Sequence, residues 1–160
     1  MKDPDAVADA DGEWFEVENP GTTDVAICSG WTLEDYSGEV VAVPAVVVPA
    51  GSRVVLGNNT DTATNGGAAV DAAYSTAFDL GNGADEIVLV FDDPVGGEVT
   101  IDGVAWRNSA HWPSTAGSSL SLDPGATSAT DNDDAASWCH GTTTYGSGDV
   151  GTPGDVNDGC

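Results

Sequence analysis

Short apolar runs separated by turn residues, at intervals of about 8 to 12 positions, are the feature that most constrains the fold of this chain. Residues 46–48 and 87–91 are rich in Val and Ile, which favour extended backbone. Residues 13–18 place Phe15 and Val17 on one face and Trp14, Glu16 and Glu18 on the other, with the period of two that a strand requires. No window repeats apolar residues at helical spacing. The pattern predicts an all-β protein, an antiparallel β-sandwich.

Three local signals refine this prediction. Pro44 has no N–H for a ladder, so it should interrupt the Val-rich segment at a sheet edge or at a crossover between sheets. The continuous apolar run 87–91 suits a central strand covered on both faces. Asp102 and Gly103 have turn chemistry, and residues 126–160 are expected to be coil. We expect strands at residues 13–18, 24–28, 31–33, 40–43, 46–48, 52–56, 85–91, 98–101, 104–106 and 120–122.

The length and apolar content predict one folded domain over residues 1–160. Forty per cent of the 160 residues are hydrophobic, which is too many for a disordered acidic tail. A chain of this size buries about 70% of its unfolded surface. We expect the core within about residues 12–125, followed by a loop-rich segment, 126–160.

The charge of the chain excludes several classes of partner. Twenty-seven acidic side chains against three basic ones, Lys2, Arg53 and Arg107, give a net charge of −24. Such a surface repels nucleic acid and anionic membranes, since both are bound through Lys and Arg. No apolar stretch is long enough for a membrane span. The remaining partners are a cation, a glycan or a protein, and a dense acidic surface also keeps a domain soluble and monomeric.

The three cysteines allow three single disulfide pairings. Cys139 and Cys160 bracket a Gly-, Thr- and Asp-rich segment with little apolar content to hold it against the body. We favour a Cys139–Cys160 disulfide, which requires an oxidising compartment and so indicates an extracellular protein. Cys28 would then be a buried small hydrophobic residue between Ile27 and Trp31.

Five short motifs occur in order along the chain: Gly-Glu-Trp-Phe-Glu-Val-Glu-Asn-Pro-Gly at 12–21, Ser-Gly-Trp-Thr-Leu at 29–33, Pro-Ala-Gly at 49–51, Gly-Ala-Asp-Glu-Ile-Val-Leu at 83–89 and Gly-Thr-Pro-Gly at 151–154. They resemble those of the lamin tail domain, an immunoglobulin-like sandwich found in nuclear lamins and in secreted bacterial proteins. Together they extend over roughly residues 12–156. The resemblance implies an immunoglobulin-like antiparallel β-sandwich with an interaction or structural role.

The sequence departs from the family in two places. Bacterial members begin with an alternating Ile and Glu strand before a Met-x-Asp/Asn-Pro turn, whereas this sequence opens at that turn, residues 1–4. We therefore expect Met1 to lie within a longer extracellular or cell-surface bacterial protein. Nuclear lamin tails are credited with chromatin binding through basic residues. That function is not transferred here, because basic residues are almost absent.

Catalytic chemistry has little support in the sequence. Neither His111 nor His140 lies in a recognisable motif for nucleophilic catalysis. Glu16 and Glu18 share a strand face, as a glycosidase pair could, but a solvated strand explains them equally well. A zinc site from the cysteines and His140 lacks the usual paired spacing. We expect no enzymatic activity and no required cofactor.

Two binding sites remain as hypotheses. Asp9, Asp11 and Glu13 near one end, with Asp131 and Asp133 near the other, could supply oxygen ligands to calcium, or they could be solvated turns. They do not form a true EF-hand loop.

The second hypothesis concerns Trp106 and Trp112, which could form an aromatic platform for a glycan or peptide, although core packing is the usual role of Trp in a small sandwich. The sequence thus favours a non-catalytic interaction, adhesion or structural accessory domain. The alternative is a calcium-assisted carbohydrate-binding module.

Overall fold

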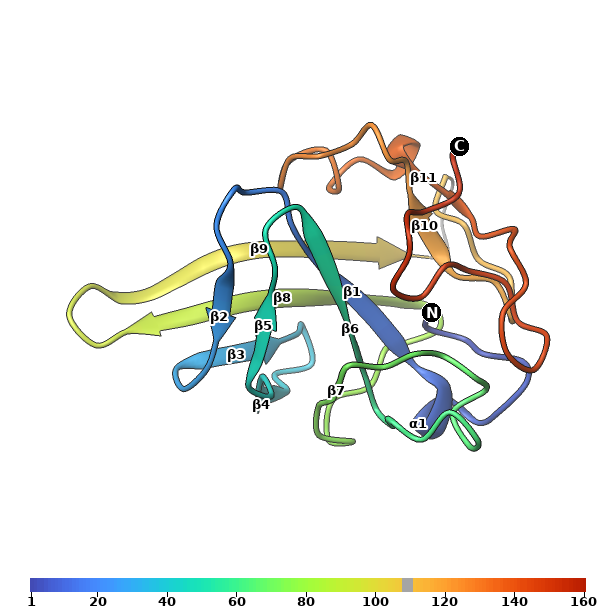
Figure 1. Ribbon diagram of the computed structural model, residues 1–160, viewed down its shortest axis with the longest axis horizontal. Coiled ribbons are helices and arrows are strands. Elements are labelled where there is room, and N and C mark those ends of the chain that lie inside the picture. The colour runs from blue at the N-terminus through green and yellow to red at the C-terminus, as the bar shows by residue number, and fades with distance from the viewer. Residues whose placement is uncertain (108–110) are drawn as a thin grey trace.

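The computed structural model describes residues 1–107 and 111–160, and its regular secondary structure is almost entirely strands, joined by many loops (Figure 1). This confirms the all-β prediction. In the described residues, no helix is long and apolar enough to cross a membrane. The elements are α1 Asp9–Gly12, β1 Trp14–Asn19, β2 Val25–Ile27, β3 Trp31–Glu34, β4 Val40–Ala42, β5 Val46–Val48, β6 Ser52–Gly57, β7 Ala72–Ala73, β8 Ala84–Asp93, β9 Gly97–Arg107, β10 Leu120–Leu122, the 3₁₀ turn η1 Ala135–Ser137 and β11 Trp138–His140.

Within the described residues, four sheets make up the sandwich. The largest has the order β4-β3-β8-β9 and is antiparallel throughout. Strand β8 lies between β3 and β9, which confirms its central position. The other sheets are β1-β6-β7, β2-β5 and β10-β11. The chain changes sheets at Pro44, since β4 pairs with β3 whereas β5 pairs with β2, so, of the two predicted alternatives, the crossover is confirmed.

The alternation along β1 divides its side chains between two apolar clusters. Phe15 and Val17 pack against the main core, where their partners in β6 are Leu56 and Val54. Trp14, on the opposite face of the strand, belongs to a smaller cluster with Met1, Val55 and Ala68. The centre of the main core includes Leu33, Val48, Phe78, Ile87 and Leu89.

Strand β9 differs from the sequence prediction. It runs without interruption through Asp102 and Gly103, which the sequence suggested would form a turn. The register places Leu89 opposite Asp102 and Val90 opposite Thr100, so Ile101 is the extra residue of a β-bulge. The bulge accommodates the Asp-Gly pair inside the long β8–β9 hairpin, whose tip projects beyond the other strands (Figure 1).

The C-terminal segment is more ordered than the predicted coil. Strand β11 pairs with β10, which joins residues far apart in sequence. The Trp14 indole N–H donates to the Tyr145 hydroxyl at 3.1 Å. Asp149 Oδ1 accepts the backbone N–H groups of Asp5 and Ala6 at 3.2 Å each. The segment is therefore attached to the N-terminal residues as well as to β10.

The cysteine predictions have different outcomes. Cys139 and Cys160 form a disulfide with their Cα atoms 5.6 Å apart, which confirms the favoured pairing. Cys28 is free and exposed, so the prediction of a buried residue was wrong. The cause is the strand alternation, since Ile27 points into the core and the next residue points outward.

Candidate functional site

One backbone edge of β1 is open. β1 is the terminal strand of its sheet, so only one of its two edges pairs with β6. On the other edge Met1 and Trp14 exchange two hydrogen bonds, from the Met1 amino group to the Trp14 carbonyl at 2.8 Å and in return at 3.0 Å. Along a strand, the N–H and C=O groups of every second residue point to the same edge. The main-chain groups of Glu16 and Glu18 therefore face away from β6, as those of Trp14 do. Within residues 1–107 and 111–160, no hydrogen bond reaches these groups from that side.

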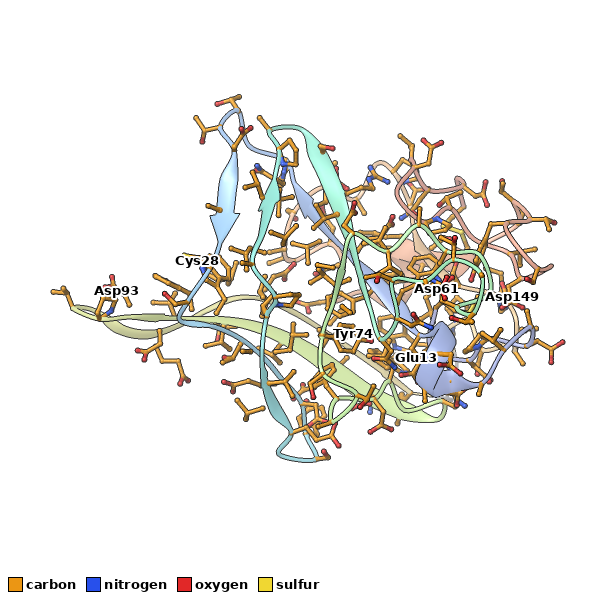
Figure 2. All side chains as sticks on the ribbon, turned by 60° about the horizontal axis from the view of Figure 1, so that its bottom comes forward. Glu13, Cys28, Asp61, Tyr74, Asp93 and Asp149 are labelled. Atoms are coloured by element: carbon orange, nitrogen blue, oxygen red, sulfur yellow. A yellow bond between two sulfur atoms is a disulfide. The ribbon has the colours of Figure 1, made fainter. Side chains whose placement is uncertain are left out.

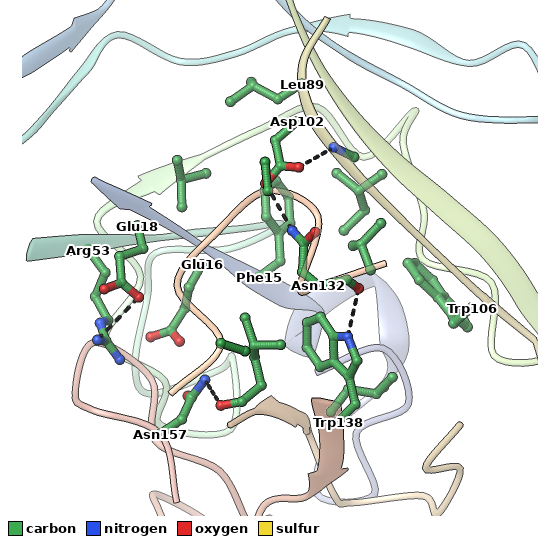
Figure 3. A pocket seen from close by; sticks show the side chains of 18 of the residues that line it. Phe15, Glu16, Glu18, Arg53, Leu89, Asp102, Trp106, Asn132, Trp138 and Asn157 are labelled. Carbon is green, nitrogen blue, oxygen red and sulfur yellow. Dashed lines mark hydrogen bonds and ion pairs between the residues drawn. The ribbon is translucent and has the colours of Figure 1, made fainter. Parts of the chain in front are cut away.

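A groove runs along this open edge (Figure 3). We call it the β1 groove. It has a volume of about 390 Å³ and lies between β1, β9 and the C-terminal segment. An adjoining hollow of about 210 Å³ continues it toward β2 and shares Val17, Leu89 and Ile101 with it. Its apolar wall includes Phe15, Val17, Leu89, Val104, Leu120 and Leu122.

Hydrogen bonds and one ion pair organise the polar rim of the groove. The Arg53 guanidinium lies 3.4 Å from the Glu18 carboxylate, and Glu16 Oε1 accepts the Gly154 N–H at 2.7 Å. Asn132 donates to Asp102 Oδ2 at 2.9 Å, as Figure 3 shows. Carboxylates therefore outnumber cationic side chains along the rim.

Burial shifts the titration of three groups that line the groove toward their neutral forms. It raises the pKa of Glu16, although the hydrogen bond from Gly154 acts in the opposite direction. It also raises the pKa of Asp102, against hydrogen bonds from Gly103 and Asn132. It lowers the pKa of the Met1 amino group to about 5. The groove is therefore an environment of low polarity.

Glu13 is a buried acid just outside the groove. It is only 2% exposed, and its Oε2 accepts hydrogen bonds from Asn58 Nδ2 and from the Leu80 N–H, each at 3.1 Å. Burial raises its pKa to about 7. Figure 2 shows it on the same side of the molecule as Tyr74, whose pKa is also raised by burial. The burial of Glu13 could have been predicted from the sequence, because side chains two residues apart in a strand project to the same face, and Phe15 faces the core.

The structure does not gather the five proposed calcium ligands. Glu13 is turned inward, and Asp9 Oδ2 accepts a hydrogen bond from Asn82 at 3.0 Å. At the other end of the chain, Asp131 Oδ2 accepts the Ser128 N–H at 3.1 Å, and Asp133 is exposed. The part of the chain that the structure describes contains no group of three or more His, Cys, Asp or Glu placed to hold a metal ion. Calcium binding stays a prediction without support from this packing.

The two proposed platform tryptophans lie in different surroundings. Trp106 is 7% exposed, and its indole N–H donates to the Gly81 carbonyl at 2.9 Å. It packs in the main core and also borders the β1 groove, so its role in ligand binding stays a prediction. Trp112 lies beside Trp138, with ring centroids 5.8 Å apart, and both rings line the β1 groove. Sequence reasoning missed Trp138, because only the β10–β11 pairing brings it to this position.

Comparison with known proteins agrees with the fold. The model of the Lamin Tail Domain family matches residues 1–108 of the 160. No curated protein and no solved structure matches the chain. The family has an immunoglobulin-like β fold and is generally non-catalytic, which agrees with the antiparallel sheets. Since the match covers more than half of the sequence, this chain belongs to the Lamin Tail Domain family.

Proposed function

We propose that this protein is a non-catalytic interaction domain of an extracellular or cell-surface bacterial protein, acting in adhesion or as a structural accessory module. The β1 groove carries this proposal. It combines an apolar wall and an acidic rim on a scaffold of paired strands. Concave, mostly apolar sites with a few fixed polar groups are typical of binding surfaces.

The polar groups of the groove favour binding over bond cleavage. A glycosidase needs one carboxyl group as acid and a second as base or nucleophile. Here Glu18 pairs with Arg53 and Glu16 accepts a hydrogen bond from Gly154, so both carboxyl groups have structural partners. The generally non-catalytic character of the family supports the same proposal.

The disulfide and the charge support an extracellular location. A Cys139–Cys160 disulfide is stable in an oxidising compartment. The net charge of −24 favours a protein or a glycan over nucleic acid as partner. The predicted absence of a required cofactor stays part of the proposal.

An activity screen with a surface-location assay tests the proposal. The purified protein should not turn over glycoside, ester or peptide substrates. On intact producing cells, an antibody against the protein should bind, and added protease should remove the signal. Hydrolysis that disappears in Glu16→Gln, while the circular dichroism spectrum is preserved, would contradict the non-catalytic role.

The alternative, a calcium-assisted carbohydrate-binding module, is favoured by one observation. The Trp112 and Trp138 rings line the groove side by side, and aromatic rings of this kind can stack on sugars. Glycan-array binding that is lost on adding a chelator would support this alternative. Binding that survives the chelator would exclude the calcium requirement.

A further inference from the structure

The lysine of this chain is buried beside an asparagine side chain. Lys2 is the only Lys in the 160 residues. We propose that its amine condenses with the side-chain amide of Asn82, with Asp9 as general base, to form an intramolecular isopeptide bond. The bond would join the N-terminal segment to the loop between β7 and β8 and would restrict the unfolded chain as a disulfide does. This modification goes beyond the proposed binding function and does not depend on it.

The surroundings of Lys2 favour a nucleophilic amine. Lys2 is 4% exposed, whereas lysine is almost never fully buried unless it is paired. Within residues 1–107 and 111–160, the salt bridge that forms joins Arg53 to Glu18, so the Lys2 ammonium is not paired with a carboxylate. Burial lowers the pKa of Lys2, although the charges of Asp3 and Asp9 act in the opposite direction. A lowered pKa increases the fraction of neutral amine, which is the nucleophilic form.

The side-chain amide of Asn82 lies within reach of this amine. Lys2 Nζ donates a hydrogen bond to the main-chain carbonyl of Asn82 at 2.5 Å. Bond lengths keep the Cγ atom of an asparagine within about 5 Å of its own carbonyl oxygen. Rotation of the flexible Lys2 stem and of the Asn82 side chain can therefore bring Nζ to Cγ. Holding the two groups together replaces a bimolecular encounter by an intramolecular one.

Asp9 is placed to move the proton that this reaction requires. Asn82 Nδ2 donates to Asp9 Oδ2 at 3.0 Å. The neutral Lys2 amine attacks Cγ of Asn82, and the Asp9 carboxylate takes one proton from Nζ and passes it to Nδ2. The Nζ–Cγ bond forms, the Cγ–Nδ2 bond breaks, and ammonia leaves. Asn82 is exposed, so ammonia can escape into solvent.

The reaction is balanced without a further reactant. An amine and a primary amide give a secondary amide and one molecule of ammonia. Neither an oxidant nor a cofactor is required, and Asp9 ends in the ionised form in which it began.

Mass spectrometry of the purified whole chain, after prolonged incubation at mildly alkaline pH, is the test. Wild type should lose the mass of one ammonia molecule, and a digest should contain a branched peptide that joins residues 2 and 82. After denaturation, an amine reagent should no longer label a lysine side chain, because Lys2 is the only one. An unchanged mass, or the mass gain of a deamidation, would overturn the proposal.

Lys2→Arg is the matched control. Arginine keeps the positive charge and the hydrogen-bond donors, but its guanidinium stays protonated and does not attack an amide. This variant should keep its full mass. Asn82 precedes Gly83, and an Asn-Gly pair can also lose ammonia by cyclising through the glycine nitrogen. Loss of ammonia at an equal rate in Lys2→Arg and wild type would assign the loss to that cyclisation and overturn the isopeptide bond.

Asp9→Asn tests the general base. The variant keeps the size of the side chain but cannot take a proton from Nζ, so the loss of ammonia should be about a hundredfold slower. The circular dichroism spectrum should stay unchanged. An equal rate in Asp9→Asn and wild type would contradict the role of Asp9. If this variant does not fold, Lys2→Arg and the branched peptide still decide whether the bond forms.

Discussion

Replacing Glu13 with Gln should stabilise the protein at neutral and alkaline pH and leave its stability unchanged in acid. Burial raises the pKa of this carboxyl group from 4.5 to about 7. The folded state therefore holds the proton more tightly than the unfolded state does. Glu13 favours folding most below pH 4.5, and this contribution is lost as the pH rises through about 7.

The size of the effect follows from that rise in pKa. A change from 4.5 to about 7 corresponds to about 3 kcal/mol of unfolding free energy at pH 8. For a chain of this length it amounts to a melting temperature higher by about 10 °C in the variant. Glutamine should keep the local hydrogen bonds, because Asn58 and the Leu80 N–H both donate to the same oxygen, Oε2.

The measured quantity is the difference in unfolding free energy between Glu13→Gln and wild type, from urea denaturation at several values of pH between 4 and 9. The difference is needed because the Met1 amino group, with its pKa lowered to about 5, changes stability in the opposite direction over this range. The control is Glu18→Gln, at a half-exposed carboxylate, where the difference should stay within about 0.5 kcal/mol. A Glu13→Gln difference that does not grow between pH 5 and pH 8, or that has the opposite sign, would refute the reasoning.

Four further outcomes are expected. Cys139→Ser should lower the unfolding free energy by about 3 kcal/mol, because the disulfide closes a loop with a sequence separation of 21; reductant should do the same to wild type. Phe78→Ala should cost about 3 to 5 kcal/mol in urea denaturation, since its fully buried ring packs in the main core. In the native protein without reductant, a thiol reagent should modify Cys28 alone, as judged by intact mass. Millimolar calcium should leave the melting temperature unchanged, because the proposed acidic ligands are not brought together.

Local chemistry was sufficient to predict most of the strands. The limits of β5 agree with the Val run 46–48, and the crossover at Pro44 follows from its missing N–H. The central position of β8 follows from its continuous apolar run. These features depend on properties of the residue itself or of its immediate neighbours.

The errors arose where a distant contact outweighed the local signal. Asp102 and Gly103 have turn chemistry, but pairing with β8 and the bulge at Ile101 keep them in one strand. Strand β11 forms because it pairs with β10 and because its Cys139 is crosslinked to Cys160. Neither effect can be recognised from composition alone.

The candidate site was even less accessible from sequence. The groove exists because β1 ends its sheet and because β9 and the C-terminal segment border the same edge. Glu13 is buried by partners at positions 58 and 80, far along the chain. Sequence reasoning instead grouped acidic residues by type, and the structure separates them.

The attachment of the C-terminal segment affects how this domain could be moved between proteins. The family match ends at residue 108, but Tyr145 contacts Trp14, and Asp149 accepts hydrogen bonds from residues 5 and 6. A fusion cut at the family boundary would leave the Trp14 indole without this hydrogen bond and remove the Leu120 and Leu122 wall of the groove. A fragment that keeps these contacts in a fusion protein is therefore longer than the family match, and it should include the residues through Cys160.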